Sequence, residues 1–210
     1  MKNYNVRRGL AYTKLGLFSF LRLYKALIIT GFLFALFGFM IGIFTAFKFT
    51  GDLTIEHIND KTLIYYITGD TGWLGFFLVR LVNVVFMVVC IGFLCMTRFT
   101  SLLCYLILIY KTYKIGVTCA VLINIYGVGG IINVLVVIIP CNLIFVLALI
   151  GLIIVLQKGC FASCRYKESI FSSFFFNEYG NTLIFISIIL IISIILEMLL
   201  LPSLTIFIIE

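Results

Sequence analysis

Charged residues are scarce in this sequence of 210 residues. Only 11% of the residues are charged, 64% are hydrophobic, and the mean hydropathy is +1.28. A soluble globular domain is roughly 45–50% apolar and about 25% charged, so this chain has too little polar sequence to cover a core that faces water. The sequence therefore excludes a soluble fold and predicts one membrane domain, which its length fits.

The sequence also lacks the residues and motifs of the common enzyme classes. His57 is the only histidine. Its neighbours Asp52, Glu56 and Asp60 have helical spacing and offer a divalent-cation site as an alternative, but we interpret the group as solvated surface. There is no His-Glu-x-x-His, Gly-x-Ser-x-Gly, Walker or Rossmann pattern, and no Asp lies in an apolar run. We therefore expect no enzyme activity, no metal and no cofactor.

The seven cysteines are an odd number and carry no metal-site pattern. Five of them lie in apolar runs and are interpreted as small hydrophobic residues. Cys160 and Cys164 have no histidine nearby, so we expect reduced thiols there rather than a zinc site.

Five continuous apolar runs are long enough to cross a bilayer. They are residues 26–47, 73–96, 100–126, 131–157 and 182–208. In lipid every backbone polar group must be bonded internally, and uninterrupted runs of this length predict helices rather than barrel strands. Lys111 and Lys114 interrupt the third run, which leaves two re-entrant half-helices as the alternative. We predict an all-α polytopic membrane bundle of about five transmembrane helices, with residues 26–210 as a single domain.

The distribution of Lys and Arg sets the orientation of these spans. Residues 1–25 carry six basic residues and no acid, which predicts a basic amphipathic cytoplasmic leader on anionic lipid and no cleavable signal peptide. Arg98 and residues 158–167 are basic as well, whereas the loop 48–72 is acidic and is expected outside. We therefore expect a cytoplasmic N-terminus and an outer C-terminus. The net charge of +7 follows from this topology, and we expect no nucleic-acid partner.

Glycine and proline mark three local features. Gly38 and Gly42 form a small-xxx-small pair, which allows close helix packing; we favour packing within the chain, with dimerisation and a homo-oligomer as the alternative. Residues 127–130 (GVGG) predict a tight outer turn. Pro140 lies within the fourth span and predicts a helix kink.

Polar residues within the spans are the candidates for function, because burying a charge in lipid is costly. The candidates are Arg80, Lys111, Lys114 and Glu197, with the amides Asn83, Asn124, Asn133 and Asn142. We predict a structural ion pair between Glu197 and Lys111 or Lys114, and an ion or proton path is the alternative. Arg80 lies about two turns inside its helix, so reaching outward to the membrane surface is an alternative for its side chain.

Four short motifs, in this order and spacing, resemble the stage II sporulation protein M family. They are YKTYKIGVT at residues 110–118, GVGG at 127–130, IIPCNLI at 138–144 and LEMLLLP at 196–202. The resemblance runs over most of the chain. Cys141 departs from the family, which usually has a polar residue there. The His-Gly and following Glu of non-sporulation members are absent, so the chain is more similar to the sporulation branch.

The resemblance implies a non-enzymatic anchor in the bacterial inner membrane, at the mother-cell or septal membrane of a sporulating cell. Family members localise two peptidoglycan hydrolases during forespore engulfment, a lytic transglycosylase and an amidase/endopeptidase. We expect the loop 48–72 to contact such a partner through Ile64, Tyr65, Tyr66 and Trp73; the alternative is that these side chains form an aromatic belt at the lipid head groups. A permease or channel subunit, working with a separate ATPase, is the alternative function.

Overall fold

The computed structural model describes residues 24–49, 73–95, 101–166 and 173–209, and this part of the chain is helical apart from turns at Tyr24 and Gly127. The elements are α3 (Lys25–Phe49), α5 (Trp73–Cys95), α6 (Ser101–Tyr126), α7 (Val128–Asn133), the π-helix η2 (Val134–Ile138), α8 (Ile139–Tyr166) and α9 (Ser173–Ile209). α7, η2 and α8 follow one another without a break. Five of the resulting helical segments are long and apolar enough to cross a membrane. The predicted fold, a polytopic helical bundle, is confirmed.

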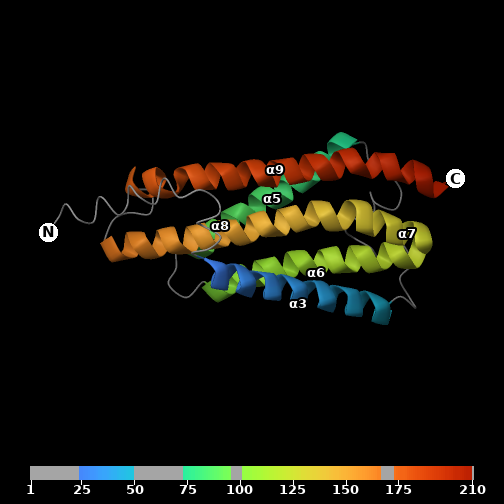
Figure 1. The fold of residues 1–210 in the computed structure, drawn as a ribbon, viewed down its shortest axis with the longest axis horizontal. Helices are drawn as coiled ribbons and strands as arrows, with labels where there is room; N and C mark the ends of the chain where they lie inside the picture. Colours follow the sequence, from blue (N-terminus) through green and yellow to red (C-terminus); the bar gives the residue numbers. More distant parts are fainter. Residues whose placement is uncertain (1–23, 50–72, 96–100, 167–172, 210) are drawn as a thin grey trace.

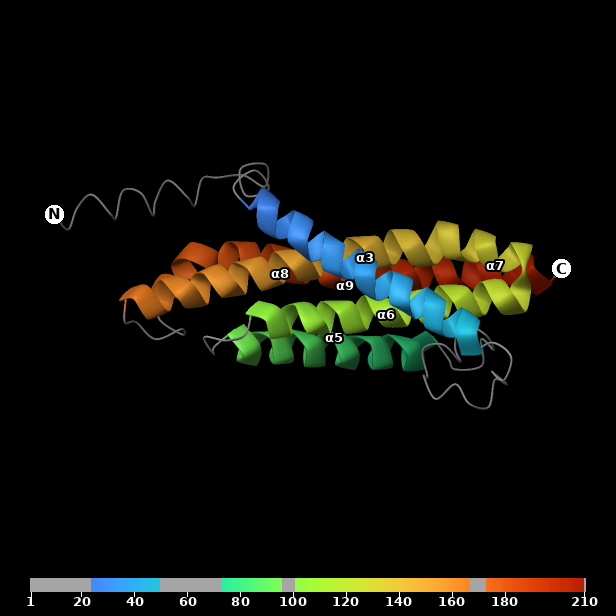
Figure 2. The same ribbon diagram turned by 90° about the horizontal axis from the view of Figure 1, so that it is seen from below.

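The five spans run in alternating directions along one bundle axis (Figures 1 and 2). α6 is a single continuous helix of 26 residues, so the alternative of two re-entrant half-helices is wrong. The ammonium group of Lys158 lies 5.8 Å from the ring centroid of Tyr24. This contact brings the end of the predicted leader and the start of the predicted cytoplasmic loop to the same end of the bundle.

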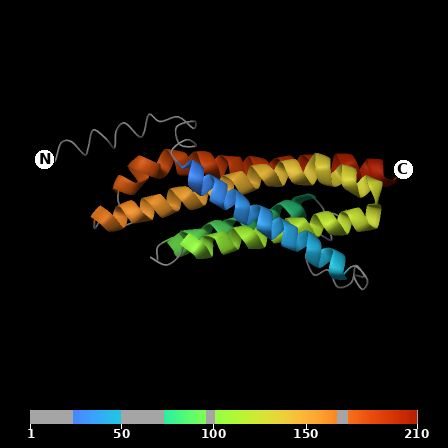
Figure 3. The ribbon, with the colours of Figure 1, turned by 60° about the horizontal axis from the view of Figure 1, so that its bottom comes forward.

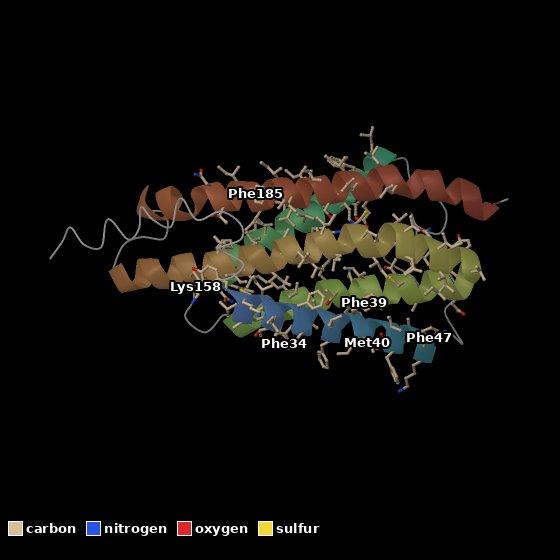
Figure 4. The ribbon with its side chains drawn as sticks, in the orientation of Figure 1. Phe34, Phe39, Met40, Phe47, Lys158 and Phe185 are labelled. Carbon is tan, nitrogen blue, oxygen red and sulfur yellow. The ribbon has the colours of Figure 1, made fainter. Side chains whose placement is uncertain are left out.

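Large apolar side chains cover the outside of the bundle. Phe44 is 77% exposed and Met40 is 64% exposed, and Met40 and Phe47 project from α3 away from the other helices (Figure 4). Such a surface would aggregate in water, but lipid solvates it. The fold is therefore that of a multi-pass membrane protein.

The segment Val128–Lys158 forms the core, since 67% of the residues in its most apolar stretch are buried. Leu149, Ile153 and Ile154 on α8 are almost fully buried. α9 packs along one side of α8, and α3 and α6 lie on the other (Figures 1 and 3). Every other span therefore packs against α8 or α6.

Three glycines allow α3 and α6 to cross with their backbones in contact (Figure 3). A Cβ atom on Gly42 would overlap the carbonyl of Tyr113, and one on Gly116 would overlap the carbonyl of Phe39. Gly38 faces Thr112 in the same way. The small-xxx-small pair of α3 therefore packs within the chain, against a glycine of α6.

The predicted GVGG turn joins α6 to α7. Gly127 has a φ of 55°, a left-handed conformation that favours glycine. Its N–H donates to the carbonyl of Ile123 at 2.9 Å, and its own carbonyl accepts from Ile131 at 3.1 Å. Gly127 thus ends one helix and begins the next, while Gly130 lies directly against the carbonyl of Leu122.

The π-helix η2 immediately precedes Ile139 and Pro140, where a kink was predicted. Buried positions recur every four residues across this region, at 133/134, 137/138, 141/142 and 145/146. An α-helix has 3.6 residues per turn, so a four-residue repeat would drift around its surface. A π-helical turn holds more residues than an α-helical turn, so it offsets this drift. The irregularity therefore keeps one face of the segment turned inward on both sides of Pro140.

The crossing of α3 and α6 gives a stability prediction with a matched control. We expect Gly116→Ala to lower the free energy of unfolding by about 1–3 kcal/mol, because the added methyl group overpacks the contact. Gly92→Ala on α5 meets no atom within 4 Å and should be neutral or slightly stabilising, since Ala favours the helix. Unfolding in mixed micelles measures both variants. Equal stability of the two would contradict the close crossing.

Candidate functional site

A buried ion pair joins α5 to α9 in the interior of the bundle. The Nε of Arg80 donates to Oε2 of Glu197 at 3.0 Å, and its Nη2 contacts Oε1 of the same carboxylate. The two side chains are only 10% and 4% exposed. Arginine thus meets the carboxylate through two parallel contacts, a geometry that lysine cannot reproduce.

Asn142 extends this pair to α8. Its Oδ1 accepts from Nη2 of Arg80 at 3.4 Å, and its Nδ2 lies 3.4 Å from Oε1 of Glu197. The same Nδ2 donates to the carbonyl of Ile138 at 2.9 Å. One residue before Asn142, the carbonyl of Cys141 accepts a hydrogen bond from the hydroxyl of Ser193 on α9 at 2.7 Å. Three spans are therefore tied together by polar contacts around the π-helix.

The structure corrects one part of the sequence interpretation. Arg80 forms an ion pair with Glu197, whereas the sequence predicted a pair with Lys111 or Lys114. Arg80 does not reach outward to the membrane surface, because its side chain is buried. The antiparallel arrangement of α5 and α9 places their polar residues at the same depth, and the spacing along the sequence did not reveal this.

Beside the ion pair lies a cavity of about 170 Å³ between α5, α6 and the region of η2 and α8. The polar residues that line it are Arg80, Asn83, Lys111, Lys114, Thr118 and Asn142. The ammonium group of Lys111 lies 5.0 Å from the ring centroid of Phe145, and that of Lys114 lies 5.3 Å from the ring centroid of Tyr110. Most of the predicted polar network therefore converges on one place.

Other predicted residues lie elsewhere. Asn124 is exposed near the end of α6 and does not line the cavity. Ile64, Tyr65 and Tyr66 of the predicted partner loop lie outside the described residues, and Trp73 is the first residue of α5.

The described residues contain no group of three His, Cys, Asp or Glu side chains that could hold a metal ion. The cysteines described as free are in the spans, and Cys104, Cys119 and Cys141 are at most 2% exposed, as expected for small core residues. No family model matches the chain, and no curated protein or solved structure matches it either. The interpretation of the site therefore depends on its own geometry.

The ion pair gives a prediction that distinguishes a specific pairing of the two charges from a general effect of two polar side chains. Arg80→Met or Glu197→Gln alone should lower the free energy of unfolding by about 3–5 kcal/mol, since each leaves a partner buried without its charge. The double variant Arg80→Met/Glu197→Gln should recover much of this loss. Unfolding of all variants in micelles measures the coupling.

A matched control for these variants is Lys48→Met, which removes an exposed cation at the end of α3. It should leave stability nearly unchanged, because exposed charges contribute little. Additive losses in the double variant would contradict a pairing of Arg80 with Glu197.

Proposed function

We propose that this multi-pass protein is a non-enzymatic membrane anchor that localises peptidoglycan hydrolases at a septum, as the stage II sporulation protein M family does. The observation that supports this proposal most is that two of the motifs that resemble the family lie in contact with each other. Asn142 follows Pro140 in one, and Glu197 precedes Pro202 in the other. Their side chains lie 3.4 Å apart although they are 55 positions apart in the chain.

The closed arrangement of the ion pair is in keeping with a structural role. Arg80, Asn142 and Glu197 bond to one another, and together they link α5, α8 and α9. Once desolvated, such a network is stable in one geometry, because separating its members would expose charges to lipid. A rigid bundle of this kind suits a protein that holds partners at a fixed place.

The proposed partners are a lytic transglycosylase and an amidase/endopeptidase on the outer side of a bacterial inner membrane. The loop 48–72 is the proposed contact, because α3 ends at the end of the bundle opposite to Lys158 (Figure 4) and the loop sequence carries the aromatic residues Tyr65 and Tyr66. Aromatic side chains are common anchors of protein interfaces.

The test is photo-crosslinking in native membranes. A photo-reactive residue at Tyr65 should capture a cell-wall hydrolase. The same residue at Lys158, which is exposed at the other end of the bundle, should not, because a hydrolase outside the membrane cannot reach it. Mass spectrometry of the captured proteins identifies the partner. Capture of an ATPase or permease subunit, or of lipid alone, at Tyr65 would contradict the anchor proposal.

One observation favours a second function, a permease or channel subunit. Three cations line a cavity near the middle of the bundle, and transporters commonly bind their substrates near the bilayer midplane. If this function holds, membrane vesicles from cells with the chain should take up phosphate faster than vesicles from cells without it. Lys114→Gln should remove the difference while Lys158→Gln keeps it. Equal uptake with and without the chain would contradict transport of phosphate.

A further inference from the structure

We propose that α5 forms the interface between two copies of this chain, with Asn83 at its centre. A two-fold axis along the membrane normal relates the two copies. This inference depends on the outer face of α5 alone, and it holds whether or not the chain anchors hydrolases. The glycine pair of α3 takes no part in the interface, because Gly38 and Gly42 already pack against α6 within the chain.

The first argument is the position of Asn83. It lies 10 residues after Trp73 and 12 residues before Cys95, which places it near the middle of the span. Its side chain is exposed at the surface of α5, and its amide has no hydrogen-bond partner among the described residues. A polar group without a partner is costly in lipid, and transmembrane helices satisfy such groups with hydrogen bonds from a neighbouring helix.

The second argument is the spacing of the residues around Asn83. Alternating intervals of four and three residues separate Val79, Asn83, Phe86, Cys90 and Phe93. This heptad spacing lets two nearly parallel helices pack along a left-handed seam. None of the five side chains is buried, and Phe86 and Phe93 are 68% and 69% exposed. The seam is therefore open to another helix over roughly 21 Å at a rise of 1.5 Å per residue.

The chain itself also covers α5 less than any other span. Only 11% of the residues in its most apolar stretch are buried, the lowest share of the five spans. The inner face of α5 carries Arg80, Val84 and Ile91, which are buried in the bundle. α5 lies at the edge of the bundle beside α6 (Figure 2). A second helix therefore reaches the seam without displacing a described element.

The third argument identifies the partner as a second copy. An amide donates and accepts hydrogen bonds at once, so two Asn83 side chains related by a two-fold axis can each donate to the other. Such an axis brings the same residue to the same depth in both chains, so one asparagine per chain is sufficient. A helix from another protein would need its own polar residue at this depth. A single Asn in a heptad seam also fixes the register and the number of helices.

The first test measures association of the full chain in liposomes. Copies that carry a donor or an acceptor fluorophore on an N-terminal tag are mixed, and energy transfer is measured at decreasing ratios of protein to lipid. We expect transfer above the level of chance proximity, with an efficiency that rises linearly with the acceptor fraction, as it does for a dimer.

The variants for this test are Asn83→Val and Asn83→Gln, with Asn124→Val as the matched control. Asn83→Val should weaken association about tenfold, because it removes the hydrogen bonds between the helices. Asn83→Gln keeps an amide and should retain most of the association. Asn124→Val removes an exposed amide of α6 outside the seam and should associate normally.

Unfolding in micelles, at a dilution that separates the copies, distinguishes lost association from lost folding. Asn83→Val should unfold at a temperature no lower than that of the unchanged chain, because the amide of Asn83 has no partner within the described part of a single copy.

The second test uses the thiol of Cys90, which is free and partly exposed. Cys90 lies seven residues after Asn83, at the equivalent position of the next heptad, so the two-fold axis brings two Cys90 side chains face to face. Two differently tagged copies are expressed together, with Cys95, Cys160 and Cys164 replaced by Ala. A short bis-maleimide should then give a product in native membranes that carries both tags.

A matched control moves the thiol to another face of α5. Val85 is 51% exposed and lies outside the seam, five residues before Cys90 and therefore more than a quarter of a turn around the helix. In the same background, Val85→Cys combined with Cys90→Ala should give much less of the product with both tags.

Four results would overturn the proposal. The first is energy transfer at the level of chance proximity at every ratio, and the second is equal association by Asn83→Val and Asn124→Val. The third is the absence of a Cys90 product with both tags, and the fourth is a product that joins Cys90 only to another protein. Crosslinking from Tyr65 in Asn83→Val tests the anchor function separately, since capture of a hydrolase there does not require the dimer.

Discussion

A charge in the interior of a bilayer has to find its partner within the protein, and this requirement organises the structure. Glu197 meets Arg80 from a distant part of the chain, and Asn142 completes the contact from a third helix. Lipid cannot substitute for a missing partner at this depth, so the three spans have to hold their relative depth and rotation. The ion pair therefore determines the register of α5, α8 and α9 more tightly than apolar packing would.

α3 and α6 are held by a different means. Lipid solvates apolar side chains as well as another helix does, so burial of leucine or phenylalanine gives little drive for association. Backbone approach at Gly38, Gly42 and Gly116 increases van der Waals contact instead. Phe34 also stacks on Tyr105 across the same pair of helices, with ring centroids 5.2 Å apart. Close packing on one side and charge pairing on the other thus stabilise the same bundle.

The sequence predicted the helices well because lipid leaves few other options for long apolar runs. It also predicted the GVGG turn, since Gly127 adopts a backbone conformation that favours glycine. It did not predict the π-helix before Pro140, because Leu135, Val136 and Ile139 on the exposed face are as apolar as the buried residues. The pairing of Glu197 with Arg80 was missed for a related reason. Which cation meets Glu197 depends on how each helix is rotated about its axis, and this rotation cannot be predicted from a helix that is apolar on every face.

The lysines of α6 differ physically from the ion pair beside them. Arg80 and Glu197 are explained by each other, since together they cancel a cost that each alone would impose. Lys111 and Lys114 add two positive charges near the middle of α6, where each ammonium group lies close to an aromatic ring. A neutral side chain of similar length would fill the same space at lower cost. The aromatic rings of Phe145 and Tyr110 therefore offset only part of the cost of burying each charge.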